Sequence, residues 1–280
     1  MEEENTINKV PKAQYAIIGG SGTYSVSFPE DLEGTSAVVL DREMIFSTPY
    51  GDSPPFKLFS LGEKLVLTLK MHGWRDGVTR ADASRQVFWV LREAGVKKII
   101  AEGGVGSINR LLRPQDLIVP TDYLDQSMRK DVSLGSPYLL VMKQPVCPQI
   151  RDLLVQVAED RATGRVFDCG VYAVTDGRHF ESVAEVEMLH RLGADIVGQS
   201  MCPEVYLARE IGACYGRLDM VVNYAEGVVQ EWDYQKLRHI FFNEPQRIGG
   251  ILLAAVEGLS PDQSCGCETY RKPTLLRGGF

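Results

Sequence analysis

The chain has 280 residues, of which 44% are hydrophobic and 24% are charged, and its formal net charge is −7. These values are typical of a soluble globular protein that forms one large α/β domain or two small ones. The negative charge argues against nucleic acid or an anionic membrane surface as the main partner, and no apolar run approaches the ~20 residues that span a bilayer. Residues 1–14 are polar and lack the features of a secretory signal, so we predict a flexible tail and a cytoplasmic protein.

Six cysteines occur in the chain: Cys147, Cys169, Cys202, Cys214, Cys265 and Cys267. The first four stand alone in the sequence, which is typical of buried thiols in a reducing compartment. Cys265 and Cys267 form a C-G-C pair, but no further ligands lie at the short spacing of a zinc site. The histidines also lack metal-ligand spacing, so we predict no metal site. The C-G-C pair is either redox-active, able to form disulfides, or a pair of exposed thiols in a tail.

The first predicted strand is Tyr15–Ile18, and it runs directly into the glycine-rich turn Gly19–Gly22. Such a turn lets backbone N–H groups approach an anion, and the hydroxyl of Ser21 adds a donor. A plain tight turn is an equally good interpretation of these residues. The pattern is neither G-x-G-x-x-G nor a Walker motif, so it favours neither a dinucleotide nor a nucleoside triphosphate as ligand.

The next part of the chain predicts two antiparallel strand pairs. Val38–Leu40 is expected to pair with Met44–Phe46, and Phe56–Leu61 with Lys64–Leu69. A helix is predicted over Asp82–Ala94, because its apolar residues follow helical spacing and a glycine comes directly after it.

The second half of the chain alternates strands with helices. Strands are predicted at Lys98–Ala101, Asp116–Val119, Gly170–Val174, Asp195–Val197 and Cys214–Val222, and helices at Pro148–Glu159, Ser182–Leu192, Pro203–Ile211 and Tyr234–Val256, the last interrupted near Pro245. This alternation indicates one α/β domain with a mixed central β-sheet flanked by helices. We expect the segment from Ser260 onward to be an extended tail.

Polar residues collect where several of these strands end. The glycine-rich segment 102–107 follows one strand, and the polar segments 175–185, 193–204 and 218–227 adjoin three others. Strand ends of an open α/β sheet converge on the ligand crevice. The pattern therefore predicts a site assembled for one small molecule.

Many short motifs occur in the order found in one enzyme family. They include A-I-I-G-G-S-G, T-P-Y-G, K-M-H-G, G-G-V-G-S-I, F-E-S-V-A-E and L-G-A-D-I-V-G, between Tyr15 and Glu257. On these motifs the chain resembles the trimeric purine nucleoside phosphorylases, most closely the methylthioadenosine phosphorylase branch. The resemblance implies a nucleoside phosphorylase-like domain at 15–258, between the tail at 1–14 and a C-terminal extension at 259–280.

Enzymes of this family are pentosyltransferases that cleave the bond between a purine and its ribose. The resemblance implies phosphate as co-substrate, no cofactor, and a homotrimer. The site is expected to hold phosphate on one side of the sugar and to stabilise the charge that develops on the departing purine on the other.

The resemblance assigns base recognition to three residues. Phe180 corresponds to the residue that stacks on the purine, Glu181 to the one that accepts from N1–H, and Asn223 to the one that bonds N7 and O6, so the last two are the expected catalytic pair. Family members that use 6-aminopurines have Asp at the third position. An amide donates to O6 and N7, whereas a carboxylate must be protonated to do so, and we therefore expect a 6-oxopurine base. A core role for Phe180 and a solvated surface position for Glu181 are the structural alternatives.

The remaining roles concern phosphate and sugar. The resemblance assigns phosphate to Ser21, His72, Gly104 and Ser200, and ribose to Gln199 and, from the neighbouring subunit, Met142. The apolar residues around Met142 favour an apolar 5′ substituent or a 5′-deoxy sugar, as in 5′-methylthioinosine.

Three residues depart from the family pattern on the phosphate side. Met71 stands at the position of an Arg, Gly103 stands at that of a Thr, and Glu102 directly precedes Gly103. Each lost charge-assisted hydrogen bond is worth ~1.5–3 kcal/mol, and Lys70 or Arg75 are candidate substitutes. The first hypothesis is a 6-oxopurine nucleoside phosphorylase. The alternatives are a phosphate-independent nucleoside hydrolase or glycosyl-transfer variant, and a nucleoside-binding protein.

Overall fold

The computed structural model describes residues 9–71, 75–229, 234–261 and 265–275. Its centre is a mixed sheet of eleven strands with the main order β11-β8-β14-β7-β1-β6-β5-β2. These strands are β1 (Tyr15–Gly19), β2 (Val38–Met44), β5 (Phe56–Leu61), β6 (Lys64–Lys70), β7 (Lys98–Ser107), β8 (Leu117–Ile118), β11 (Val166–Phe167) and β14 (Cys214–Tyr224). A branch contains β9 (Asp122–Asp125), β12 (Val171–Val174) and β13 (Ile196–Gly198), and β13 joins it to β7.

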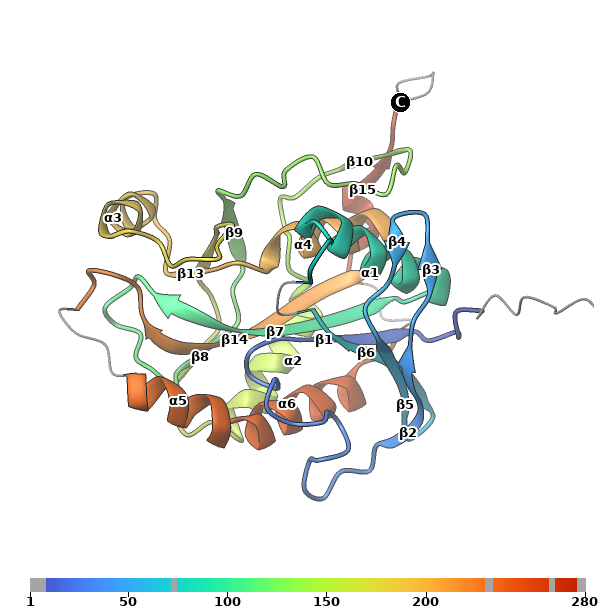
Figure 1. The fold of residues 1–280 in the computed structure, drawn as a ribbon, viewed down its shortest axis with the longest axis horizontal. Coiled ribbons are helices and arrows are strands. Elements are labelled where there is room, and N and C mark those ends of the chain that lie inside the picture. Colours follow the sequence, from blue (N-terminus) through green and yellow to red (C-terminus); the bar gives the residue numbers. More distant parts are fainter. Residues whose placement is uncertain (1–8, 72–74, 230–233, 262–264, 276–280) are drawn as a thin grey trace, which may run out of the picture.

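Helices cover both faces of this sheet (Figure 1). One face carries α1 (Arg80–Ala94) and α4 (Met201–Ile211), and the other carries α2 (Pro148–Glu159), α5 (Tyr234–Asn243) and α6 (Pro245–Gly258), while α3 (Val183–Arg191) lies at one end. A hydrophobic core fills each interface. The first contains Phe88 of α1 and Val205 of α4, and the second contains Ile150 of α2 and Ile251 of α6. The predicted single α/β architecture with a mixed sheet is confirmed.

The predicted helices are confirmed, and their ends have local causes. Helix α3 begins after a capping box in which Ser182 and Glu185 satisfy each other's backbone N–H groups. The N-cap of α1 is Thr79, whose side chain accepts from the backbone N–H of Asp82, so this helix begins two residues earlier than predicted. The last predicted helix is indeed divided at Pro245, into α5 and α6. Among the residues that the structure describes, no helix is both long and apolar enough to cross a bilayer.

Several strand predictions are wrong. Val38–Leu40 and Met44 belong to one strand, β2, which pairs with β5 across two register shifts, so they do not form a pair with each other. The glycine-rich segment 102–107 continues β7 and does not follow its end. Strand β14 likewise extends to Tyr224. Both strands are longer because they pair with each other in parallel along nearly their whole length.

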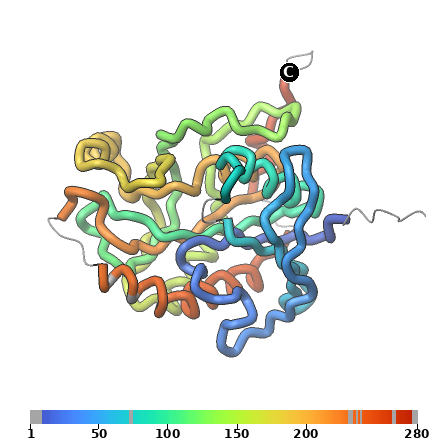
Figure 2. Tube along the Cα trace, viewed as in Figure 1, coloured from blue at the N-terminus to red at the C-terminus, as the bar shows by residue number. Residues whose placement is uncertain are grey.

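The terminal segments are more ordered than predicted. Within the supposed tail at 1–14, Ala13 is buried and its backbone N–H donates to the carbonyl of Ala94; residues 1–8 lie outside the described part. After Ser260 the chain forms the short 3₁₀ helix η1 (Cys267–Tyr270) and the strand β15 (Arg271–Pro273). Strand β15 pairs with β10 (Tyr138–Leu140), and Figure 2 shows these distant segments side by side; β3 (Ser47–Thr48) and β4 (Gly51–Asp52) form another small sheet.

The cysteine prediction also needs correction. Cys147 and Cys202 are buried as expected, but Cys169 is exposed and Cys214 is only partly buried. Cys214 is not isolated either, because its sulfur lies 3.2 Å from that of Cys265. The fold therefore brings together cysteines that the sequence separates.

Candidate active site

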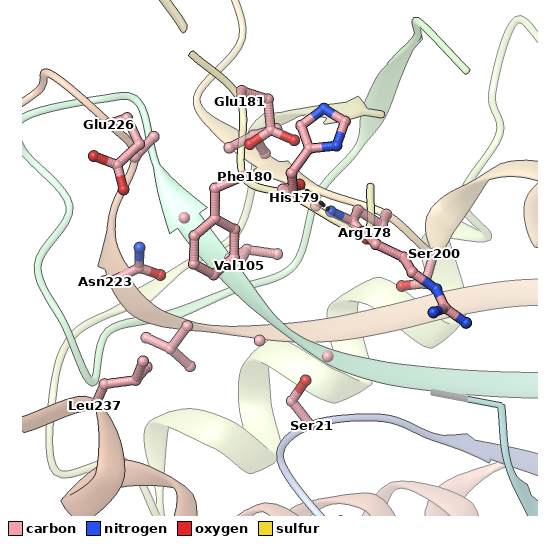
Figure 3. A pocket seen from close by; sticks show the side chains of 18 of the residues that line it. Ser21, Val105, Arg178, His179, Phe180, Glu181, Ser200, Asn223, Glu226 and Leu237 are labelled. Atoms are coloured by element: carbon pink, nitrogen blue, oxygen red, sulfur yellow. Dashed lines mark hydrogen bonds between the residues drawn. The ribbon is translucent and has the colours of Figure 1, made fainter. Parts of the chain in front are cut away.

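A cavity of about 440 Å³ opens where the later parts of β7 and β14 meet the loops after β1, β12 and β13. This volume lies within the range of small-molecule sites. Figure 3 shows two groups of side chains in it: Phe180, Glu181 and Asn223 at one end, and Ser21 and Ser200 at the other. The arrangement has two chemically different ends, one aromatic with an amide and a carboxylate, and one lined by hydroxyls.

The first group contains the three residues predicted to contact a base. Phe180 is 58% exposed and lines the cavity, so the alternative of a core aromatic is wrong. Glu181 is only 8% exposed and accepts a hydrogen bond from the hydroxyl of Thr175, so the alternative of a solvated surface charge is also wrong. The structure places Asn223 in the same cavity, as the sequence predicted.

A β-bulge explains how Asn223 reaches the cavity. Side chains of a regular strand alternate between its faces, yet Val222 and Asn223 both line the cavity. The register between β14 and β7 shifts between Val221 and Asn223, and such a shift turns a side chain toward a new direction. The amide nitrogen of Asn223 donates to the carbonyl oxygen of Tyr224 at 2.8 Å, which holds the side chain at the cavity rim.

Sequence reasoning missed a second acidic group at this end. Glu226 follows β14 and lines the cavity near Asn223 (Figure 3). It lies in a polar segment that the sequence singled out, but no spacing rule distinguished it from its neighbours.

The second group contains three of the four residues predicted to bind phosphate. Ser21, Gly104 and Ser200 line the cavity, whereas His72 lies outside the described residues. The hydroxyl of Ser200 accepts from Nη2 of Arg217 at 3.2 Å. Arg217 is fully buried and also forms a bidentate pair with Asp219, with N···O distances of 2.7 and 2.6 Å. This pair fixes the orientation of Ser200 from behind the cavity.

The same buried pair explains why Gly103 departs from the family pattern. A Cβ atom at Gly103 would lie 2.8 Å from Nη2 of Arg217 and 3.1 Å from Oδ1 of Asp219. A side chain at this position would have to displace the ion pair, so the packing disfavours a threonine. Gly104 is similarly confined, since its Cβ would lie 2.9 Å from a methyl group of Val222.

Glu102 occupies the inside of the glycine-rich turn. Its carboxylate accepts from the backbone N–H groups of Gly20, Gly22 (2.8 Å) and Thr23 (3.1 Å), and from the hydroxyl of Thr23 (2.7 Å). Glu102 is only 4% exposed. The backbone N–H groups of the turn therefore bind an anionic group, as predicted from its glycines. That group is the side chain of Glu102 and not a bound ligand.

Neither substitute cation proposed from the sequence reaches the cavity. The ammonium of Lys70 donates to the carbonyl oxygens of Tyr24 and Val26, at 2.6 and 2.9 Å. The guanidinium of Arg75 donates to the side chain of Gln86. Their hydrogen bonds direct both groups toward other partners, so this expectation is wrong.

Two other arginines do line the cavity, Arg80 and Arg178. Arg80 donates to the backbone carbonyls of Asp176 and Gln199, and burial lowers its pKa to about 10, so it is still a cation at neutral pH. Figure 3 shows the guanidinium of Arg178 beside Ser200, at the hydroxyl end. The only signal for Arg178 in the sequence was its place in a polar segment after a strand.

The two residues predicted to contact the sugar lie apart. Gln199 lines the cavity, and its amide nitrogen donates to the carbonyl oxygen of His179 at 3.2 Å. Met142 does not line it; it borders another hollow, together with Tyr138 and Tyr206. A role for Met142 requires a neighbouring copy of the chain and stays a prediction.

Comparisons with known proteins show which family the chain resembles. Residues 14–257 match the Phosphorylase superfamily. The chain is 32% identical over 256 residues to a probable S-methyl-5′-thioinosine phosphorylase of Methanothermobacter thermautotrophicus, covering 90% of this chain and 86% of the relative. It is 30% identical over 270 residues to the 6-oxopurine nucleoside phosphorylase of Pyrococcus furiosus, covering 92% of this chain and 97% of the relative. A crystal structure of a methylthioadenosine phosphorylase from an antarctic soil metagenomic library superposes with a TM-score of 0.75 at 25% identity, covering 92% and 91% of the two chains.

Proposed function

Because the chain belongs to the Phosphorylase superfamily, we propose that it cleaves the N-glycosidic bond of a 6-oxopurine nucleoside with phosphate. The products are the free base and the 1-phosphate of the sugar. The observation that carries this proposal is that Phe180, Glu181 and Asn223 line one cavity whose other end carries Ser21 and Ser200. The names of the two relatives, which act on 6-oxopurine nucleosides or S-methyl-5′-thioinosine, support the same base class.

The base end of the cavity suits a 6-oxopurine leaving group. Phe180 stacks on the purine, Glu181 accepts a hydrogen bond from N1–H, and the amide of Asn223 donates toward O6 and N7. Negative charge develops on the purine as the glycosidic bond breaks, so the amide donor of Asn223 stabilises the transition state more than the ground state.

The hydroxyl end of the cavity suits phosphate. Ser21 and Ser200 donate to the phosphate oxygens, and Gly104 lets the backbone approach closely. Arg178 and Arg80 supply the positive charge that the family places at the position of Met71. Phosphate then attacks the anomeric carbon from the side opposite the departing base, and positioning of the two reactants supplies much of the rate enhancement. The chemistry requires no cofactor.

The sugar pocket completes the proposal. Gln199 contacts the ribose hydroxyls, and Met142 of a neighbouring subunit closes the apolar 5′ side in a homotrimer. A 5′-methylthio substituent suits such a wall, which agrees with the name of the Methanothermobacter relative. The free cysteines of the structure support a reducing compartment, the cytoplasm.

The test is release of free base from inosine, guanosine, 5′-methylthioinosine, adenosine and 5′-methylthioadenosine, each with and without phosphate. We expect release from the three 6-oxopurine substrates, in the presence of phosphate only. Equal rates without phosphate would contradict phosphorolysis, and a preference for the two adenine nucleosides would contradict the base assignment. Neither relative is named a hydrolase, and the comparisons give the phosphate-independent alternative no support.

A further inference from the structure

Four cysteine sulfurs from three distant stretches of the sequence lie close together. The Sγ atoms of Cys147, Cys214, Cys265 and Cys267 all lie within 4.8 Å of one another. None of these residues lines the cavity described above. The cluster is therefore a separate feature that the proposed reaction does not use.

Three different parts of the fold bring these sulfurs together. Cys147 is the N-cap of α2, and Cys214 is the first residue of β14. Cys265 and Cys267 flank Gly266, whose φ of 74° lies in the left-handed region that favours glycine. This turn lets both cysteines of the C-G-C pair face the same point. The C-terminal segment thus contacts the core of the domain through sulfur.

The spacing matches a tetrahedral set of thiolate ligands. Zinc–sulfur bonds of about 2.3 Å place the four sulfurs of a Cys₄ site roughly 3.8 Å apart. The observed sulfurs include one pair at 3.2 Å, Cys214 and Cys265, and no pair beyond 4.8 Å, so small rotations of the side chains produce the coordination geometry. A disulfide joins two sulfur atoms, whereas here four sulfur atoms lie close together, as in a tetrahedral metal site.

The surroundings favour negatively charged sulfur. The ammonium of Lys98 lies 3.5 Å from Sγ of Cys214, and Lys98 is only 2% exposed. A zinc ion with four thiolates carries a charge of about −2, and a buried cation beside it offsets part of that charge. Cys147 sits at the N-terminal end of α2, where the helix dipole also stabilises a thiolate.

We propose that Cys147, Cys214, Cys265 and Cys267 bind one Zn²⁺ ion in a structural tetrathiolate site. Each thiol releases its proton to solvent when it binds the metal. Cys147 and Cys267 are buried and all four positions are taken by protein sulfur, so no ligand position is left open for substrate. The ion would link the C-terminal segment that contains η1 and β15 to the first residues of α2 and of β14.

The primary test uses the unaltered full chain, purified anaerobically with a phosphine reductant and without chelators. Elemental analysis is expected to give about one zinc per chain. Addition of cobalt(II) to the zinc-free protein is expected to produce the charge-transfer and d–d absorption of a tetrahedral tetrathiolate. Neither measurement depends on nucleoside cleavage, so a negative result would count against the zinc site without testing the proposed function.

Matched variants locate the ion. The double variant Cys265→Ser with Cys267→Ser should lose the zinc, whereas Cys169→Ser, at an exposed cysteine outside the cluster, should keep it. Lys98→Gln removes only the neighbouring cation and should weaken zinc binding by about 10–100-fold. Failure of the reduced full chain to bind either zinc or cobalt would overturn the proposal. Full zinc content in the double variant, or a disulfide within the cluster detected by thiol alkylation of the freshly purified chain, would overturn it as well.

Discussion

The carboxylate of Glu102 accepts a hydrogen bond from the backbone N–H of Gly22 at 2.8 Å, inside the glycine-rich turn. The turn after β1 therefore gives several of its donors to a side chain of β7 and not to a bound anion. Phosphate must then rely on the side chains at the hydroxyl end of the cavity, and the remaining charge must come from arginine.

The first prediction concerns Glu102 itself. Glu102→Gln keeps the shape but replaces one acceptor oxygen by a donor that faces backbone N–H groups. We expect the free energy of unfolding to fall by about 1–3 kcal/mol, because hydrogen bonds to a charged acceptor are lost. We also expect the KM for phosphate to fall, since a buried negative charge near the anion disappears. Urea unfolding and phosphate titration measure the two effects, and unchanged stability would contradict the structural role of this carboxylate.

The second prediction concerns Arg178 as the phosphate cation. Arg178→Met should raise the KM for phosphate by about 10–100-fold, because one charge-assisted interaction of ~1.5–3 kcal/mol is lost. The KM for the nucleoside should change little. Arg191→Met is the control, since Arg191 lies on the exposed surface of α3 away from the cavity. A parallel rise of both KM values would indicate a general disturbance of the site and would count against this assignment.

The third prediction concerns the choice of base by Asn223. Asn223→Asp should lower the ratio of kcat/KM for inosine to that for adenosine by about 5–150-fold, since a mismatched hydrogen bond costs about 1–3 kcal/mol. Asn223→Ala should lower both rates without this change of preference. Steady-state kinetics with the two nucleosides measure this ratio. An unaltered ratio in Asn223→Asp would contradict the role of Asn223 in the choice of base.

The fourth prediction uses two glycines with opposite surroundings. Gly103→Ala places a methyl group 2.8 Å from the buried guanidinium of Arg217 and should destabilise the fold by about 1–3 kcal/mol. Gly250→Ala, in α6, meets no atom within 4 Å and should be neutral or stabilising by up to about 1 kcal/mol. Denaturant unfolding of the two variants provides the comparison. Equal effects would mean that the ion pair of Arg217 does not confine this position.

The sequence alone determined the fold class, the helices and the residues at the base end of the cavity. Helix α3, for example, is encoded locally by a capping box at Ser182 and by its apolar spacing. Phe180, Glu181 and Asn223 could be predicted because each belongs to a motif that resembles the purine nucleoside phosphorylases, although the bulge that turns Asn223 into the cavity is visible only in the structure.

Only the tertiary structure decided which charged groups reach the phosphate end of the cavity and which cysteines lie together. Parallel pairing of β1 with β7 sets Ile18 opposite Ala101, and this register puts Glu102 at the turn that begins with Gly19. The register depends on packing of the whole sheet and not on either segment. The same long-range packing joins the C-terminal cysteines to the starts of α2 and β14, contacts that no local spacing in the chain encodes.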